Sequence, residues 1–251
     1  MPIFDQINLP SPTQEKPRGT RMGVTLAKVT NIKDPENLGR VKCAFLTANK
    51  DALELDWAYV MTPFGGNNYG LFCMPNVNDI VLVAFEDGDK RRPFIIGSIW
   101  GNIVTPPVQI KDGKNNIYQL KTPNQTIIEL NDEKDKGALS VKTPKGIEIN
   151  LSDEKKTVEV KDGSNTITLD GNGGEVTIKC KNKLTIEVGS ASISIDGSTG
   201  AIKIKGNQSV SIEGSQVNIN ANTNATLKGN TQVSIESSGM TNVKGSMLKL
   251  N

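Results

Sequence analysis

The sequence predicts an all-β protein, with a small N-terminal barrel followed by a long array of short strands. Three observations support this prediction. The apolar residues of the 251-residue chain follow no helical period over any long stretch. Every Phe, Trp and Tyr lies between Phe4 and Tyr118, so the composition changes sharply along the chain. After Leu120, apolar residues recur in pairs separated by one residue, and turn residues follow the pairs. A boundary is therefore expected between Gly101 and Gln125.

The composition argues against several classes of function. Lys and Arg number 29 against 27 Asp and Glu, a balance that argues against a nucleic-acid binder. The chain has no histidine, which removes Ser-His-Asp catalysis and histidine-ligated metal sites. No catalytic residue, metal or other cofactor is therefore expected. The three cysteines are far apart and form no disulfide framework, which fits a reducing cytoplasm. Neither a signal peptide nor a membrane-spanning run is visible.

Four segments are expected along the chain. Residues 1–20 contain four prolines and little periodicity, which is typical of an extended arm. Residues 21–103 are expected to form the barrel. Residues 104–124 are expected to form a linker and neck, because a proline pair within them cannot donate hydrogen bonds to a sheet. Residues 125–251 are expected to form the strand array.

The barrel is expected from short alternating strands that end in turn residues. Residues 80–85 form a compact apolar run, and the turn sequence Glu86-Asp87-Gly88-Asp89 follows it. Several such strands at close spacing are typical of a small barrel. The residues expected to form its core are Val41, Cys43, Phe45, Val81, Val83, Phe85, Ile95, Ile96 and Trp100.

The second part is a repeat of roughly 8.6 residues, and this repeat decides the expected architecture. Each unit places two apolar side chains on one face of a short strand, and Gly, Asn or Asp usually follows in the turn. The inward-facing residues expected to line an axis are Ile147, Ile149, Val158, Val160, Ile167, Leu169, Val176, Ile178, Cys180, Ile193, Ile195, Ile202, Ile204, Val210, Ile212, Val217, Ile219, Val233 and Ile235.

A single copy of this repeat is hard to stabilise. Burying two aliphatic side chains stabilises each unit by at most about 3–6 kcal/mol. Ordering the roughly eight residues of the unit costs more than this, because each residue costs about 1.5 kcal/mol. A single chain also leaves its strand edges open along the whole array. Three chains wound together solve both problems, because the edges pair between chains and the aliphatic pairs meet on the axis. We therefore expect a homotrimeric, triple-stranded β-helical needle, with a single-chain β-roll or sandwich as the alternative.

Two neighbouring motifs in the barrel region resemble a known family. Residues 74–89 read MPNVNDIVLVAFEDGD, and residues 92–100 read RPFIIGSIW. Together they are similar to the phage baseplate assembly protein V and VgrG spike family, although Asn78 stands where that pattern has Gly. Asn tolerates the left-handed backbone that such a turn needs. Residues 29–41 are similar to the first hairpin of that family, and residues 119–124 and 141–149 resemble the start of its β-helical stalk.

The resemblance implies an OB-fold barrel at the base of a trimeric needle. In that family the needle is the central spike in the baseplate of a contractile injection system, such as a phage tail, a tailocin or a type VI secretion apparatus. We expect this chain to be a spike without enzymatic activity, made in the bacterial cytoplasm and assembled into a phage tail or tail-like particle. It joins a hub protein to a tip protein, and it punctures the target cell envelope when the sheath contracts.

Two contact regions follow from the resemblance. Hub contacts are expected on the N-terminal arm and on an exposed loop. That loop consists of Gly65, Gly66, Asn67, Asn68, Tyr69 and Gly70. A separate PAAR-like tip protein is expected to contact Leu248, Leu250 and Asn251.

Other functions stay open at this point. An OB-type barrel can bind nucleic acid, and Lys90, Arg91 and Arg92 lie together, but their acidic neighbours favour a solvated turn. A β-helix can also carry a glycan-binding or glycan-cleaving site, although the aromatic-free second part argues against one. Cys180 follows the inward register, so three copies could bind a soft metal, but a small apolar filler is the simpler interpretation.

Overall fold

The computed structural model describes residues 23–46, 53–102 and 104–249, and among them it contains β-strands and no α-helix. The chain divides into two units, residues 1–178 and 179–251. A barrel comes first and antiparallel sheets follow it, which confirms the predicted all-β fold class. The predicted N-terminal arm lies outside the described residues, as do Leu250 and Asn251.

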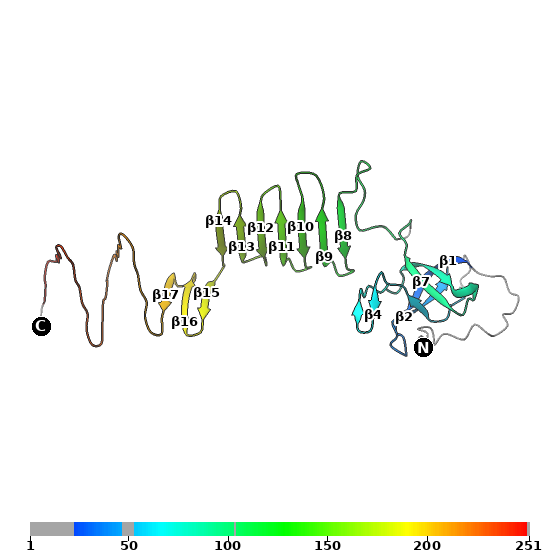
Figure 1. Cartoon of the computed structure of the whole chain (residues 1–251), viewed down its shortest axis with the longest axis horizontal. Coiled ribbons are helices and arrows are strands. Elements are labelled where there is room, and N and C mark those ends of the chain that lie inside the picture. The colour runs from blue at the N-terminus through cyan, green and yellow to red at the C-terminus, as the bar shows by residue number, and fades with distance from the viewer. Residues whose placement is uncertain (1–22, 47–52, 103, 250–251) are drawn as a thin grey trace. The chain divides into compact units, whose positions relative to one another are not determined.

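Five strands close into the barrel (Figure 1). They are β1 (Val24–Asn31), β2 (Arg40–Phe45), β3 (Ala58–Val60), β6 (Ile80–Phe85) and β7 (Pro93–Ser98), in the spatial order β1-β2-β3-β7-β6. The β3–β7 pair is parallel and the other pairs are antiparallel. Because β6 also pairs with β1, none of the five strands is left as a free sheet edge.

The core of the described structure lies inside this barrel. The buried hydrophobic residues are Ala27, Val29, Val41, Cys43, Leu55, Ala58, Ile80, Val81, Val83, Phe85 and Ile95. Phe45 is partly buried and packs against this cluster, with its ring centroid 6.4 Å from that of Phe85. Six of the nine residues expected in the core are therefore buried, and a seventh packs at its edge.

Two expected core residues are exposed instead. The side chain of Ile96 is 37% exposed, because neighbouring side chains point to opposite faces of a strand and Ile95 takes the inward position. Trp100 is 63% exposed, since β7 ends at Ser98 and the indole lies beyond the last strand position. The prediction was wrong for both because it extended the apolar run of β7 without regard to this alternation.

Asn78 adopts the left-handed backbone that the sequence requires of it, with φ +80°. It stands just before β6, and its N–H donates to the carbonyl of Val29 at 2.9 Å. The short turn η2 (Glu86–Gly88) then connects β6 to β7, and Asp87 within it also has a positive φ of 52°. Asn and Asp thus take turn conformations that are most often assigned to Gly.

A seven-stranded sheet occupies the rest of the first unit (Figure 1). Its strands are β8 (Ile117–Lys121), β9 (Ile127–Asn131), β10 (Ala138–Lys142), β11 (Glu148–Ser152), β12 (Thr157–Lys161), β13 (Thr166–Asp170) and β14 (Glu175–Lys179). They follow one another in sequence order, and the pairs from β8 to β13 are antiparallel hairpins. The sheet begins inside the segment that was expected to be linker and neck, so that boundary was placed too late.

The second unit begins with a three-stranded antiparallel sheet. It consists of β15 (Lys183–Val188), β16 (Ala191–Asp196) and β17 (Ala201–Lys205). From residue 206 to residue 249 the described chain contains no strand, although the repeat of apolar pairs continues there. Figure 1 draws this segment as a trace that runs back and forth without arrows.

Candidate assembly surfaces

Two continuous rows of apolar side chains cross one face of the seven-stranded sheet. The hydrogen-bonded register places Leu120, Ile128, Val141, Ile149, Val160 and Ile167 side by side in one row. The same register places Tyr118, Leu130, Leu139, Leu151, Val158 and Leu169 in the other row. Val141 is half-buried, and the other eleven are 37–51% exposed. This face therefore carries a broad apolar surface that nothing in the described chain covers.

The three-stranded sheet repeats this arrangement. Leu184, Ile195 and Ile202 form one row across it, and Ile186, Ile193 and Ile204 form the other. Leu184 is half-buried, whereas the exposed fractions of the other five run from 41% for Ile193 to 67% for Ile202. Most of the expected axis residues up to Ile204 thus share one face of their sheet, in the two-row order that the alternation predicts.

The structure corrects the expected axis set at two strands. Ile147 lies in the turn before β11, where its carbonyl accepts a hydrogen bond from Thr143 N–H at 2.9 Å. The row positions in that strand belong to Ile149 and Leu151. Cys180 lies just beyond the end of β14 and is exposed, so it holds no row position. Sequence alternation cannot find such breaks, because it carries no information on where a turn stops a strand.

Six further axis residues lie in the strand-free segment. Val210, Ile212, Val217, Ile219, Val233 and Ile235 are 46–80% exposed. Leu248, expected at the tip, is 63% exposed. Within the described chain these side chains have no sheet to join, so their expected inward position depends on partners.

The opposite face of the seven-stranded sheet is polar and bears paired charges. Glu148 lies between Lys142 and Lys161, with carboxylate–ammonium distances of 3.1 and 3.2 Å. Lys161 also pairs with Glu159 at 3.1 Å. Burial acts to raise the pKa of Glu148, but hydrogen bonds from the two lysines outweigh it and lower the pKa. This face suits contact with water, which leaves the aliphatic face as the one to be covered.

The loop expected to contact a hub is a small ordered ribbon. Strands β4 (Gly65–Gly66) and β5 (Tyr69–Gly70) pair in it. The Tyr69 ring lies over Gly66, where an added Cβ would come within 2.4 Å of it. Gly70 has a φ of +144°, and a Cβ there would approach the Gly65 Cα to 2.8 Å. The glycines therefore permit a tight ribbon that holds Tyr69 in place, with that side chain 69% exposed.

Apolar side chains that the sequence analysis missed flank this ribbon. Phe64 is 60% exposed and Phe72 is 81% exposed. Thr62 Oγ1 donates to the carbonyl of Leu71 at 2.7 Å, and Leu71 N–H donates to the carbonyl of Phe64 at 3.2 Å, so the ends of the loop are tied together. Phe64 and Phe72 could have been noticed in the sequence, because they lie next to the glycine-rich loop and outside any strand alternation.

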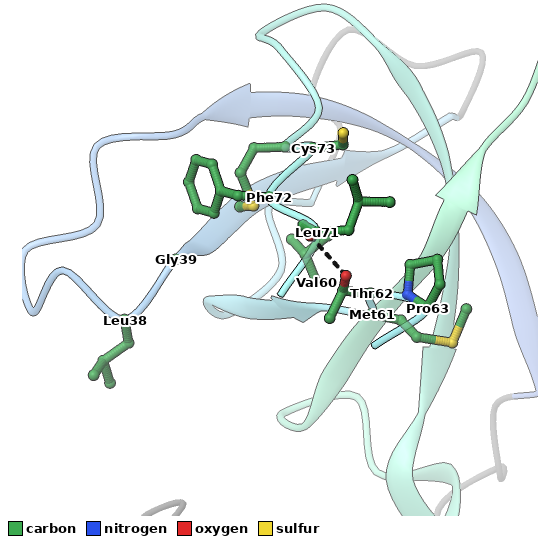
Figure 2. A pocket seen from close by; sticks show the side chains of 10 residues that line it. Leu38, Gly39, Val60, Met61, Thr62, Pro63, Leu71, Phe72 and Cys73 are labelled. Carbon is green, nitrogen blue, oxygen red and sulfur yellow. Dashed lines mark hydrogen bonds between the residues drawn. The ribbon is translucent and has the colours of Figure 1, made fainter. Parts of the chain in front are cut away.

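A hollow of about 180 Å³ lies beside the ribbon (Figure 2). It is lined by Leu38, Gly39, Val60, Met61, Thr62, Pro63, Leu71, Phe72, Cys73 and Met74. The lining contains no Asp, Glu, Lys or Arg. It therefore offers mainly apolar contact and no charged side chain.

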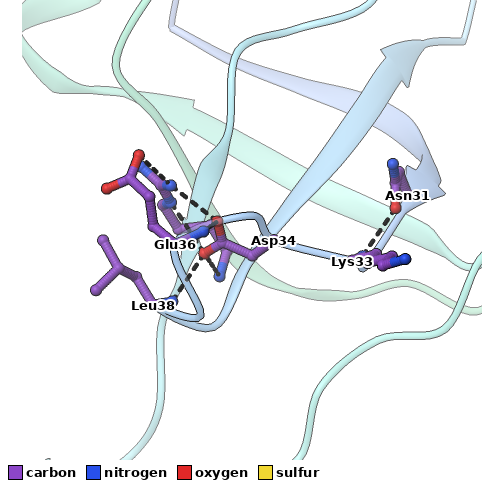
Figure 3. Close-up of polar contacts among 6 residues, drawn as sticks. Asn31, Lys33, Asp34, Glu36 and Leu38 are labelled. Carbon is purple, nitrogen blue, oxygen red and sulfur yellow. Dashed lines mark hydrogen bonds and ion pairs between the residues drawn. The ribbon is translucent and has the colours of Figure 1, made fainter.

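The turn next to this hollow is organised around Asp34 (Figure 3). This buried carboxylate accepts backbone hydrogen bonds from Glu36, Leu38 and Arg40 and a two-pronged contact from the Arg40 guanidinium, the shortest at 2.8 Å. The Arg40 hydrogen bond is the main reason that the pKa of Asp34 lies far below its usual range. The guanidinium also lies 6.0 Å from the ring centroid of Trp57. These contacts fix the turn that places Leu38 at the hollow.

Two of the three basic residues considered for nucleic-acid binding, Arg91 and Arg92, are engaged in ion pairs within the β6–β7 turn. Arg92 is 7% exposed and its guanidinium lies 2.7 Å from the Glu86 carboxylate. Arg91 pairs with Asp89 at 2.8 Å, and this hydrogen bond lowers the pKa of Asp89 to about 2. The two arginines thus hold a turn together.

No helix within the described ranges is long and apolar enough to cross a membrane. The same residues contain no group of three or more Cys, Asp or Glu side chains placed to hold a metal ion.

Comparison with known proteins assigns the barrel. Residues 25–100 match the family model described as the type VI secretion system/phage-baseplate injector OB domain. The barrel of this chain is similar to that OB domain. The match covers the strands from β1 to β7, including the ribbon and the Asp34 turn. The predicted resemblance to baseplate and VgrG spike proteins is therefore confirmed for this part of the chain.

Three curated proteins that this chain resembles are named as type VI secretion system spike proteins. The chain is 29% identical over 110 residues to the type VI secretion system spike protein VgrG5 of Pseudomonas aeruginosa, which covers 41% of this chain and 14% of the relative. It is 28% identical over 106 residues to the spike protein VgrG1b of the same organism, and this alignment covers 40% of this chain and 14% of the relative. It is 30% identical over 82 residues to VgrG3 of Vibrio cholerae, with 32% and 8% covered. The matched part thus spans less than a sixth of the length of each of these relatives.

Proposed function

We propose that this chain is the homotrimeric central spike of a contractile injection machine, a phage tail, tailocin, type VI apparatus or related particle. In this proposal the spike has no enzymatic activity. It joins a hub protein on the barrel side to a PAAR-like tip protein near Leu248, and sheath contraction drives it through the target envelope. The observation that carries the proposal is the pair of uncovered aliphatic rows on a chain that also contains an injector OB domain.

Two further copies of the chain are the partner that fits the aliphatic rows best. The rows follow the repeat itself, so each copy offers the same stripe in the same register, and three stripes close around one axis. Covering the exposed part of each aliphatic side chain contributes about 1 kcal/mol, and the rows contain many such residues. The ion-paired polar face then remains outside, in contact with water.

Solution mass tests this proposal directly. Light scattering on the purified chain is expected to give a mass near three times 27.0 kDa that does not change with concentration. The Ile195→Asp variant is expected to lose the trimer, because three carboxylates would then meet in an apolar interior. Ser194→Asp, on the opposite face of the same strand, is the matched control and is expected to remain trimeric.

A monomeric wild-type chain, or a trimeric Ile195→Asp variant, would contradict the proposal. If the wild-type chain is monomeric, a partner other than further copies of the chain would have to cover the two apolar rows. A glycan-binding or glycan-cleaving β-helical tail protein would then become the leading candidate.

The ribbon is the proposed hub contact. It exposes Tyr69, and Phe64 and Phe72 on either side of it in the sequence are exposed as well. Aromatic side chains are enriched among the residues that contribute most to binding at interfaces. Phe72→Ser is expected to leave the trimer mass unchanged and to lower the amount of chain recovered with baseplates isolated from producing cells. Recovery equal to wild type would remove this ribbon from the interface.

A further inference from the structure

The two edges at which the turns of the seven-stranded sheet lie carry opposite charge. Consecutive strands run antiparallel, so alternate turns fall at opposite edges. The lysine edge consists of residues 121–127, 142–148 and 161–166 and holds four lysines and two carboxylates. The carboxylate edge consists of residues 131–138, 152–157 and 170–175 and holds seven carboxylates and four lysines. The lysine edge therefore has an excess of positive charge, and the carboxylate edge has an excess of negative charge.

Contacts within the chain leave part of the lysine edge without partners. Glu148 takes both Lys142 and Lys161 into ion pairs, at 3.1 and 3.2 Å. Lys121 and Lys145 are exposed, and among the described residues neither has a carboxylate within ion-pair distance. These two ammonium groups are therefore available to another molecule.

The carboxylate edge likewise keeps acidic side chains without partners. Glu133 forms an ion pair with Lys136 at 2.8 Å. Asp132, Asp153 and Glu154 are exposed, and in the part of the chain that the structure describes no lysine or arginine lies within ion-pair distance of them. A basic surface would satisfy these carboxylates.

The two edges of one copy are too far apart to neutralise each other. The strands from β9 to β13 have five residues each, and a rise of about 3.3 Å per residue separates their ends by about 16 Å. Strand β11, for example, lies between Lys145 and Asp153. An ion pair needs its charged atoms within about 4 Å. The partner of each edge must therefore come from another molecule.

Symmetry brings unlike edges together in the proposed trimer. When three identical sheets close around one axis with their aliphatic faces inward, the contact between neighbours is head-to-tail, so one edge of each sheet meets the opposite edge of the next. The lysine edge of one copy then meets the carboxylate edge of its neighbour. Copies related by a three-fold axis lie at the same height. The turn of Lys145, between β10 and β11, therefore lies at the level of the neighbour's turns 132–137 and 153–156.

We infer that each corner of the trimer is an electrostatic contact, in which Lys121 and Lys145 of one copy lie against the carboxylates of residues 132–135 and 153–154 of the next. This inference rests on the proposed function and deepens it, because it names the surfaces by which the copies recognise one another. The aliphatic rows do not distinguish one edge from the other. Opposite charges attract the copies in the head-to-tail order, whereas a two-fold pair of copies would set like edges against each other. The edges thus favour a closed ring over a two-fold dimer.

Charge reversal at the edges tests this contact. K121E with K145E reverses the lysine edge, and D132K with E154K reverses the carboxylate edge. K28E with K33E, at exposed barrel positions, changes the net charge as much as the first variant does and is its matched control. When denatured chains refold at low ionic strength, each edge variant should form trimers about tenfold more slowly than wild type, and the control should not.

The combination of all four edge substitutions is expected to restore assembly. Both edges then change sign, so unlike edges meet again and the trimer should form at the wild-type rate. High salt should remove the differences between the variants, because exposed charges are screened.

A zero-length carbodiimide cross-linker tests the wild-type chain without any substitution, since it joins a lysine amine to a carboxylate only where the two are in contact. Mass spectrometry of the cross-linked trimer is expected to find Lys121 or Lys145 joined to a carboxylate of residues 132–135 or 153–154. Because the two edges of one copy are about 16 Å apart, such a link joins two copies.

The other results separate this inference from the proposed function. If the wild-type chain is a trimer but neither edge variant slows its assembly, or the cross-links do not join unlike edges, the inference is disproved and the proposed spike survives. Slow assembly of the combined variant would also overturn it, since these positions would then act on folding and not on pairing. If a variant fails to fold, the cross-linked positions of the wild-type chain decide. If light scattering gives a monomeric wild-type chain, both the inference and the proposed function fail.

Discussion

The barrel and the stalk (residues 117–249, which follow the barrel in the chain) both contain short β-strands, but they bury their apolar side chains differently. The eleven buried hydrophobic residues of the described chain all lie in the barrel, and four of them are valines that are completely inaccessible. From residue 104 to residue 249 no residue is buried, although aliphatic residues are frequent there. The difference teaches that regular alternation alone does not make a core. A closed barrel has an inside, whereas a single-layer sheet acquires one only when another layer covers it.

Replacing a barrel core residue is expected to have the largest effect on stability. Ile95→Ala removes a side chain that is 1% exposed and should lower the free energy of unfolding of the barrel by about 2–5 kcal/mol. Ile96→Ala, at the next position on the outer face, should cost less than about 1 kcal/mol. Hydrogen exchange of the barrel amides in the full chain measures both. Equal losses would mean that the barrel interior is assigned to the wrong face of β7.

Removing the Asp34 carboxylate is expected to have the next largest effect. Asp34→Asn loses the ion pair with Arg40 in a buried turn and should destabilise the barrel by about 2–3 kcal/mol. The stalk amides should exchange as in wild type, which makes the same experiment its own control. A uniform loss of protection in both regions would show that the barrel and the stalk do not unfold independently.

The same carboxylate predicts a dependence on pH. The pKa of Asp34 is lowered in the folded barrel relative to about 3.9 in the unfolded chain. Its stabilising contribution is therefore complete above the unfolded pKa and is lost progressively as the pH falls below it. Denaturant unfolding of the barrel between pH 6 and pH 2 should give a steeper fall in stability for wild type than for Asp34→Asn. Identical slopes would contradict the lowered pKa.

The outer charges of the stalk are expected to matter least. Glu148→Gln removes contacts to Lys142 and Lys161 on a partly exposed face, and it should change the stability of the trimer by less than about 1 kcal/mol per chain. Any difference should shrink in high salt, because exposed charges are screened. A melting curve at low and high salt tests this. A large, salt-independent loss would place this face in the interior and reverse the assignment of the two faces.

Much of the fold could be read from residue alternation. It located the strands of the barrel, most of its core and several residues of the two apolar rows, since side chains on a strand alternate between two faces. It failed at Ile96 and Trp100, because an apolar run does not state which residue points inward or where the strand ends. It failed at Ile147 and Cys180 for a related reason, as turns stop the strands there. The Asp34 cluster joins residues through backbone donors, which no side-chain pattern reveals.

By itself, the sequence determined that this is an all-β protein in two unlike parts, with a motif of the injector OB family in the first and a strand repeat in the second. Only the tertiary structure decided which strands pair within one chain. Alternation is a local property, set by the geometry of successive residues, so one chain is enough to specify it. Pairing is not local, because a strand edge accepts any partner that meets its hydrogen bonds. Hairpins bring that partner from the same chain as far as β17, and beyond Lys205 the described residues form no strand.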